Sequence, residues 1–175
     1  MRLLFEIDRK NYRENGSSFC RPSMRAVIRT EKGLVMIHSL KYDYYKFPGG
    51  GMEKGESQRD ALIREVAEET GLTVDPSSIR EYGCVLRREK GQEEDIFIQE
   101  NDYFFCDVRQ GARPLHLDAY EEEERFRPET VSAGKALLVN QTHRHGDKEG
   151  NPRFASMLER ENGVLRLLIQ EGCAE

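Results

Sequence analysis

Three glutamates, Glu65, Glu68 and Glu69, carry the strongest chemical signal in the chain. At about 100° per residue, positions i, i+3 and i+4 share one face of a helix, so the three carboxylates converge. Crowded carboxylates repel one another, and a hard divalent cation with oxygen ligands would compensate for that repulsion. A second interpretation stays open, in which this is an acidic helix face in water, supported by an Arg64–Glu68 pair one turn apart.

The helix that carries these acids has recognisable ends. Ser57 followed by Asp60 forms a variant of the capping box, and Gly71 stands where a left-handed residue ends a helix at low cost. The spacing therefore predicts a helix from Ser57 to about Thr70. Its other arc is apolar and predicts a face packed on a core, formed by Leu62, Ile63, Val66, Ala67 and Thr70.

A glycine-rich loop, Gly49-Gly50-Gly51, precedes this helix, and a further glycine, Gly55, lies between the loop and the helix. Glycine lets the backbone approach a phosphate or a metal closely and allows positive φ. Glu56 adds a fourth carboxylate just ahead of the helix. Together the loop and the acids favour a metal site over a purely solvated acidic face.

The full spacing resembles the Nudix box, with every defined position matched. It runs Gly50, five residues, Glu56, seven residues, Arg64-Glu65-Val66, one residue, Glu68-Glu69, one residue and Gly71-Leu72, with Phe47-Pro48-Gly49-Gly50 as the usual lead-in. The resemblance implies an α/β protein, a Nudix-type α/β/α sandwich with a mixed β-sheet and a catalytic loop-helix. The implied reaction is hydrolysis of a diphosphate bond in a nucleoside diphosphate linked to another moiety.

The resemblance also implies a metal-binding set. Glu65, Glu68 and Glu69 are expected to bind Mg²⁺ or Mn²⁺, together with the backbone carbonyl of Gly49 or Gly50. Glu68, or another of the three glutamates, is expected to be oriented toward the attacking water as a catalytic group.

Further acids and one arginine support that set. Arg64 is expected to orient a carboxylate through a bidentate contact, as a second catalytic residue, and Glu56 to act from outside the direct metal ligands. Four consecutive glutamates, 121–124, usually mark an exposed loop. Because family members often take an additional ligand or the general base from a later loop, we expect Glu122 or Glu123 to approach the metals.

Basic residues beyond the box are candidate phosphate contacts, namely Arg25, Lys46 and Arg87. Cations on strand surfaces often have no such role, so this alternative stays open. The proline that follows the box in many ADP-ribose hydrolases is absent here, where Arg87 and Arg88 stand. The substrate is therefore left open by the sequence.

The remaining pattern predicts one domain over residues 1–175. Strands are expected at 2–7, 24–30, 34–38, 79–88, 95–108 and 126–131, with 79–88 and 95–108 forming an antiparallel hairpin. Helices are expected at 132–140 and from Pro152 to about Gln170, with Gly163 as a candidate break. Residues 111–114 are expected to form a turn and 118–124 a charged loop. The tyrosine-rich segment 41–47 should pack at a strand edge, with one ring available to stack on a base or sugar.

Composition limits the partners. The net charge of −5 argues against a general nucleic-acid surface, and the length suffices for a core without disulfides. The cysteines lack metal-ligand spacing and predict reduced thiols: Cys20, Cys84, Cys106 and Cys173. No segment has the length of a membrane span or the apolar run of a signal peptide. We expect a cytoplasmic monomer or homodimer that acts on a small-molecule diphosphate, with no nucleic-acid polymer and no membrane as partner.

Two other functions remain as alternatives to the hydrolase. One is the same fold used as a ligand-binding or regulatory module without turnover, which would not need the whole set of acids. The other is an unrelated metal-stabilised structural protein, which would leave the glycine loop and the helix caps as coincidence.

Overall fold

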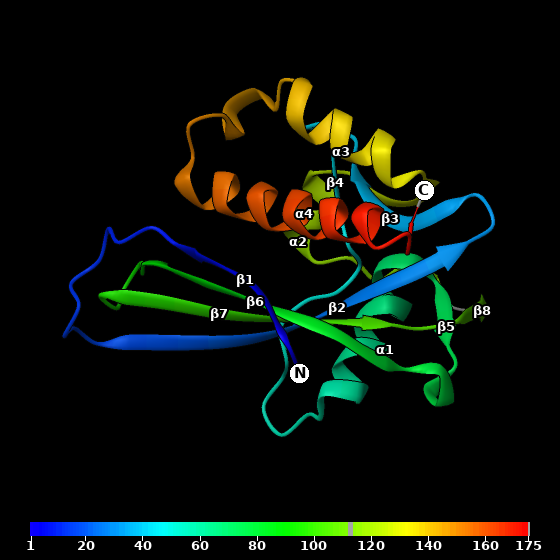
Figure 1. The fold of residues 1–175 in the computed structure, drawn as a ribbon, viewed down its shortest axis with the longest axis horizontal. Coiled ribbons are helices and arrows are strands. Elements are labelled where there is room, and N and C mark those ends of the chain that lie inside the picture. Colours follow the sequence, from blue (N-terminus) through cyan, green and yellow to red (C-terminus); the bar gives the residue numbers. More distant parts are fainter. Residues whose placement is uncertain (112–113, 175) are drawn as a thin grey trace.

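A computed structural model describes residues 1–111 and 114–174. Its central sheet lies between two layers of helices (Figure 1). One face carries α3 (Ala133–Thr142) and α4 (Pro152–Gln170), and the other carries α1 (Gln58–Thr70). The predicted α/β class with a mixed sheet between helices is confirmed.

The main sheet has the strand order β1-β6-β7-β2-β3-β4, and β9 pairs with β3 off this path. The β1–β6 and β2–β7 pairs are parallel, and the other pairs are antiparallel. The strands are β1 (Leu3–Asp8), β2 (Ser18–Thr30), β3 (Gly33–Ser39), β4 (Tyr44–Lys46), β6 (Arg80–Lys90), β7 (Ile96–Phe105) and β9 (Phe126–Val131). Two short strands, β5 (Leu72–Val74) and β8 (Val108–Gln110), form a separate antiparallel pair.

Three sequence expectations are corrected. Strand β2 begins at Ser18 rather than Met24, because its polar first half pairs in parallel with β7 from Ser18 onward. The segment expected as a charged loop contains a short helix, α2 (Ala119–Glu123), which Asp118 begins with a capping box. Gly163 does not break α4; a Cβ there would lie 2.3 Å from the ring of Phe5, so the glycine lets β1 approach the helix.

Other expectations meet the structure in part. The β6–β7 hairpin is antiparallel as predicted, and all four cysteines have free thiols. The expected turn at 111–114 includes residues 112 and 113, which lie outside the described residues. Tyr42, Tyr44 and Tyr45 are buried, so none of these rings is available to stack on a ligand. In the described residues, no helix is both long and apolar enough to cross a membrane.

Residues 23–28 of strand β2 are buried on both faces, because helices cover both sides of the sheet there. Its side chains alternate between two apolar clusters. Met24, Ala26 and Ile28 pack with Leu62 and Val66 of α1. The intervening Val27 packs on the opposite face, in the cluster that contains Val164, Leu165 and Leu168 of α4.

The glycine loop is fixed to β2 by backbone hydrogen bonds. The N–H of Met24 donates to the carbonyl of Gly50 at 2.9 Å, and the N–H of Ala26 donates to that of Pro48 at 2.8 Å. Gly49 has φ +132°, and a Cβ there would lie 2.0 Å from the carbonyl oxygen of Met24. Only glycine fits this position, because both the backbone conformation and the contact exclude a side chain.

Replacing Gly49 with alanine should therefore destabilise the fold. We expect Gly49→Ala to lower the free energy of unfolding by about 1–3 kcal/mol, the typical cost of one strained residue, or by more where the clash moves the loop. Chemical denaturation measures this. The control is Gly134→Ala, where a Cβ meets open space and stability should be unchanged or slightly higher. Equal stability of the two variants would contradict the close approach.

Candidate active site

A pocket of about 430 Å³ opens where the glycine loop, α1 and the segment leading into α2 meet. It is lined by Arg21, Gly50, Gly51, Met52, Glu53, Arg64, Glu65, Glu68, Glu69, His116, Asp118, Tyr120 and Glu121. A larger hollow of about 780 Å³ lies at the β2–β3 turn and the end of α4, but none of the Nudix-box acids reaches it. The chemistry of the lining therefore identifies the smaller pocket as the candidate site.

Arg64 is the hub of the outer part of this pocket. Its Nε and Nη2 donate to the two carboxylate oxygens of Glu56, at 2.8 and 3.0 Å. Its Nη1 donates to Glu65 at 2.9 Å and to Glu68 at 3.0 Å. Arg64 thus makes the bidentate contact expected from the sequence, with Glu56 as the bidentate partner, and it also restrains Glu65 and Glu68.

The charges around Arg64 are partly desolvated. The hydrogen bonds from Arg64 lower the pKa of Glu56 below its ordinary value. Burial raises the pKa of Glu65, against the opposing effect of Arg64. The loop lies directly on Glu65, since a Cβ on Gly50 would be 2.5 Å from both of its carboxylate oxygens. The glycine thus lets loop and helix form one wall of the pocket.

Glu69 lies deeper, and both of its carboxylate oxygens accept hydrogen bonds. Oε1 accepts from Nζ of Lys46 at 2.7 Å, and Oε2 accepts from the N–H of Gly49 at 2.7 Å. Burial raises the pKa of Glu69 to about 7, although Lys46 and the Gly49 N–H favour the charged form. Two accepted hydrogen bonds are the pattern of an ionised carboxylate.

In the run of four glutamates, the structure places Glu121 in the pocket, rather than the predicted Glu122 or Glu123. Glu121 is buried, whereas Glu122 is exposed and Glu123 pairs with Lys41 on the outside at 2.6 Å. The glutamates differ because α2 is a helix, and only the side of it that carries Glu121 faces the pocket. The sequence alone did not indicate this helix.

The predicted phosphate contacts are also corrected. Arg25, Lys46 and Arg87 are all buried, and none of them lines the pocket. Arg25 donates to the carbonyl of Gly49, while Arg87 pairs with Glu89.

Arg21 is the cation at the pocket that sequence reasoning missed. It is exposed, and a Cβ on Gly51 would lie 2.8 Å from its Nε. Across residues 1–111 and 114–174 it makes no ion pair. Because side chains alternate along a strand, Arg21 lies on the same face of β2 as Arg25. This relation could have indicated Arg21 only if the predicted strand had begun at Ser18 instead of Met24.

The donor set suits a hard divalent cation, although the side chains do not form a closed chelate. In the described residues, no group of three acids, histidines or cysteines is gathered as a metal centre. Arg64 and Lys46 engage the carboxylates instead. The Gly49 and Gly50 carbonyls, expected as ligands, already accept hydrogen bonds from Arg25 and from the N–H of Met24. Six carboxylates line the pocket and still provide the oxygen ligands that Mg²⁺ and Mn²⁺ prefer.

A family model described as NUDIX domain matches residues 21–153 of the chain. The chain belongs to the NUDIX family.

The NUDIX chain resembles curated relatives only locally. It is 39% identical over 74 residues to an RNA pyrophosphohydrolase of Ruthia magnifica subsp. Calyptogena magnifica. These aligned residues make up 42% of this chain and 37% of that protein. It is 40% identical over 48 residues to the uncharacterized Nudix hydrolase YvcI of Bacillus subtilis strain 168, covering 27% and 30%. The chain thus spans only about a third of the length of these relatives.

Solved structures agree on the fold. A NUDIX hydrolase from Nitrosomonas europaea superposes with a TM-score of 0.53 at 18% identity, covering 81% of this chain and 87% of that one. The MutT protein from Bacillus halodurans gives a TM-score of 0.54 at 18% identity, covering 81% and 84%. The predicted Nudix fold is confirmed.

Replacing the guanidinium of Arg64 should destabilise the fold, because it holds the carboxylates around it. Lysine keeps the charge but cannot make the bidentate contact with Glu56. We expect Arg64→Lys to lower the free energy of unfolding by about 1–3 kcal/mol, the scale of lost hydrogen bonds to charged groups. The measurement is thermal unfolding in chelator-treated buffer, where no cation can replace the arginine.

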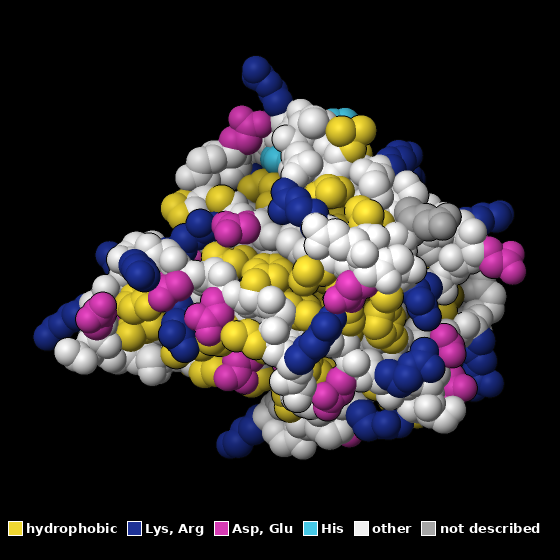
Figure 2. Space-filling view, in the orientation of Figure 1, with side chains coloured by type: hydrophobic (Ala, Val, Ile, Leu, Met, Phe, Trp, Pro, Cys, Tyr) yellow, Lys and Arg dark blue, Asp and Glu magenta, His cyan; other side chains and the backbone are white. Residues whose placement is uncertain are grey.

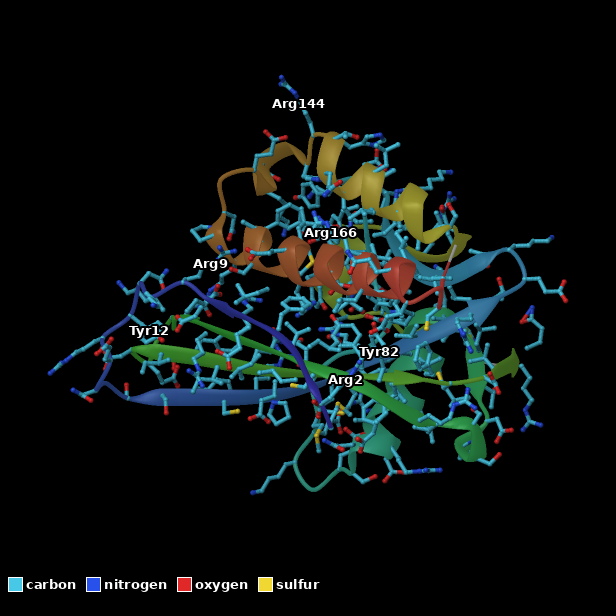
Figure 3. All side chains as sticks on the ribbon, viewed as in Figure 1. Arg2, Arg9, Tyr12, Tyr82, Arg144 and Arg166 are labelled. Carbon is cyan, nitrogen blue, oxygen red and sulfur yellow. The ribbon has the colours of Figure 1, made fainter. Side chains whose placement is uncertain are left out.

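The matched control is Arg144→Lys, because Arg144 extends away from the body of the molecule (Figure 3). Its melting temperature should equal that of the unmodified chain. If both variants melted alike, Arg64 would not be the hub of these acids.

Proposed function

We propose that this NUDIX protein hydrolyses a diphosphate bond in a nucleoside diphosphate linked to another moiety, with Mg²⁺ or Mn²⁺ as cofactor. One observation carries the proposal: carboxylates from α1 and α2 converge beside a glycine loop in one open pocket. Diphosphate hydrolysis requires neutralised phosphate oxygens and a nucleophilic water in line with the leaving oxygen. We further propose that residues 1–175 act as one domain.

The outer acids are the proposed working groups. Bound Mg²⁺ or Mn²⁺ would neutralise phosphate oxygens and lower the pKa of a water. The side chains of Glu65 and Glu68 are 14% and 33% exposed, so they face the open part of the pocket. Arg64 fixes their direction, and the more exposed Glu68 is the proposed group that orients the water.

Arg21 and Tyr120 are the proposed substrate contacts. Arg21 lies at the mouth of the pocket without an acid partner in the described residues and can accept a phosphate through its planar fork. Tyr120 is half exposed on the same lining, and its ring can stack on a base. These two side chains replace Arg25, Arg87 and the buried tyrosines of the sequence expectation.

The names of the relatives add a second substrate class. Several are called RNA pyrophosphohydrolase, so a 5′-phosphorylated RNA end joins the small diphosphates as a candidate. The net charge of −5 disfavours a broad nucleic-acid surface. Positive and negative side chains are also interspersed on the face shown in Figure 2. An RNA end that reaches only the pocket does not need such a surface.

A substrate panel tests the proposal. The purified chain is incubated with Mg²⁺ or Mn²⁺ and nucleoside diphosphates linked to sugars, nucleosides or phosphate, together with a 5′-triphosphorylated RNA oligonucleotide. Release of phosphate, pyrophosphate or nucleoside monophosphate is measured, with Glu68→Gln as the inactive control. Binding without release from any substrate would favour the alternative, a ligand-binding or regulatory module.

Glu121 should matter for turnover, whereas Glu122 should not. Glu121→Gln keeps a hydrogen-bond acceptor for the N–H of Asp118 but removes one negative charge next to Lys46. The positive charge of Lys46 is then less balanced and disfavours a nearby divalent ion. We expect kcat to fall at least tenfold, and Glu122→Gln on the exposed side of α2 to stay within twofold. Equal kcat values would remove Glu121 from the site.

Arg21 should act on substrate binding. We expect Arg21→Gln to raise KM about tenfold or more, because one hydrogen bond between charged groups contributes about 1.5–3 kcal/mol, and kcat to change less. Arg166→Gln, on the exposed side of α4, is the control. An unchanged KM for Arg21→Gln, measured on the substrate that the panel identifies, would show that phosphates bind elsewhere.

A further inference from the structure

Lys46 joins two acids that come from different helices. Its Nζ lies 2.7 Å from Oε1 of Glu69 on α1 and 3.5 Å from Oε1 of Glu121 on α2. The three side chains are almost completely buried, with exposed fractions of 8%, 2% and 7%. The same Nζ lies 4.5 Å from the centre of the Phe126 ring, within the range of a cation–π contact.

Every carboxylate oxygen of the inner acids, Glu69 and Glu121, accepts a hydrogen bond from the protein. Both oxygens of Glu69 accept hydrogen bonds, from Lys46 and from the N–H of Gly49. Oε1 of Glu121 accepts from the hydroxyl of Tyr120 at 2.8 Å, and its Oε2 accepts from the N–H of Asp118 at 3.0 Å.

The outer acids differ from the inner ones in this respect. Glu65 uses only Oε1 and Glu68 only Oε2, each toward Arg64. Over the described part of the chain, the second oxygen of each accepts no hydrogen bond from protein. The outer pair, Glu65 and Glu68, therefore has one oxygen each without a hydrogen bond from the described residues, whereas every oxygen of the inner pair is hydrogen-bonded.

The charges divide in the same way. Among the described residues, Glu56, Glu65 and Glu68 all form ion pairs with Arg64, so this cluster of ion pairs carries two net negative charges. One divalent cation would neutralise them. In the inner part Lys46 leaves a single negative charge on the pair formed by Glu69 and Glu121. Without the lysine that pair would also carry two negative charges.

We propose that Lys46 is a resident cation that occupies the inner part of the pocket in place of a divalent ion. Glu69 and Glu121 then form ion pairs with Lys46 instead of binding metal. In the absence of substrate, the chain binds one divalent ion through Glu65 and Glu68. The inference rests on the proposed function for its choice of site, and it departs from the sequence expectation that Glu69 binds metal. Lys46 is a positioning residue, since it acts through the two carboxylates.

The test counts bound Mn²⁺ without any substrate. The full chain is titrated with Mn²⁺, and free Mn²⁺ is measured by its electron paramagnetic resonance signal. The unmodified chain should bind one Mn²⁺, and Lys46→Met should bind two, because Glu69 and Glu121 are released. The double variant Lys46→Met, Glu69→Gln should return to one.

Lys41→Met is the matched control, because it removes a lysine from an exposed pair with Glu123. It should bind one Mn²⁺. The same count in Lys46→Met as in the unmodified chain would overturn the proposal, and so would a second Mn²⁺ that appears equally in the control.

Lys46→Met leaves two buried carboxylates without their cation, and this cost can prevent folding. In that case, variants that retain Lys46 test the proposal. Glu69→Gln retains Lys46 and should still bind one Mn²⁺ with less than a tenfold loss of affinity, although Lys46 is then less balanced, whereas Glu65→Gln should weaken Mn²⁺ binding at least tenfold. Loss of the ion in Glu69→Gln would overturn the proposal. The count is independent of turnover, so an inactive chain with the expected counts would reject the proposed reaction and leave the role of Lys46 intact.

Discussion

Repulsion among carboxylates is the constraint on which the rest of this structure depends. Five acids approach one another around one pocket, and two cations hold them there, Arg64 in the outer part and Lys46 in the inner part. Each cation contacts acids from separate segments of the chain. Because a buried carboxylate without a partner is costly, these ion pairs also fix how the glycine loop, α1 and α2 meet.

The backbone of β2 supplies the frame for these contacts. Backbone hydrogen bonds between β2 and the loop at 48–52 position the loop independently of the side chains of the site. The two apolar clusters then fix α1 below the sheet and α4 above it (Figure 1). A site built on a buried strand and a packed helix is held more rigidly than one built on loops alone. The geometry of the pocket is thus a consequence of core packing and strand pairing.

The sequence predicted those features that depend on residues close together in the chain, such as the ends of α1. Ser57 caps α1 and Gly71 ends it in the left-handed conformation, as the pattern indicated. Long-range packing decided the rest. The burial of Lys46 depends on β4 being covered on both faces, and the inward position of Glu121 depends on which side of the five-residue helix α2 faces the pocket. The availability of Arg21 depends on a parallel pairing with β7, a strand more than seventy residues away in the chain. A charge pattern alone does not distinguish such buried ion pairs from exposed cations.

The division of the pocket also explains why a complete Nudix box leaves the chemistry of each acid open. The box specifies that three glutamates share a helix face, but the residues outside the box decide what each glutamate contacts. Lys46 and Glu121 both lie outside the box, and together they commit Glu69 to the protein interior. In the described part of the chain, the outer pair, Glu65 and Glu68, keeps oxygens for a ligand because Arg64 is shared among three acids. Differences at positions like these, which a motif does not record, can therefore change the number of metal ions that one fully matched box holds.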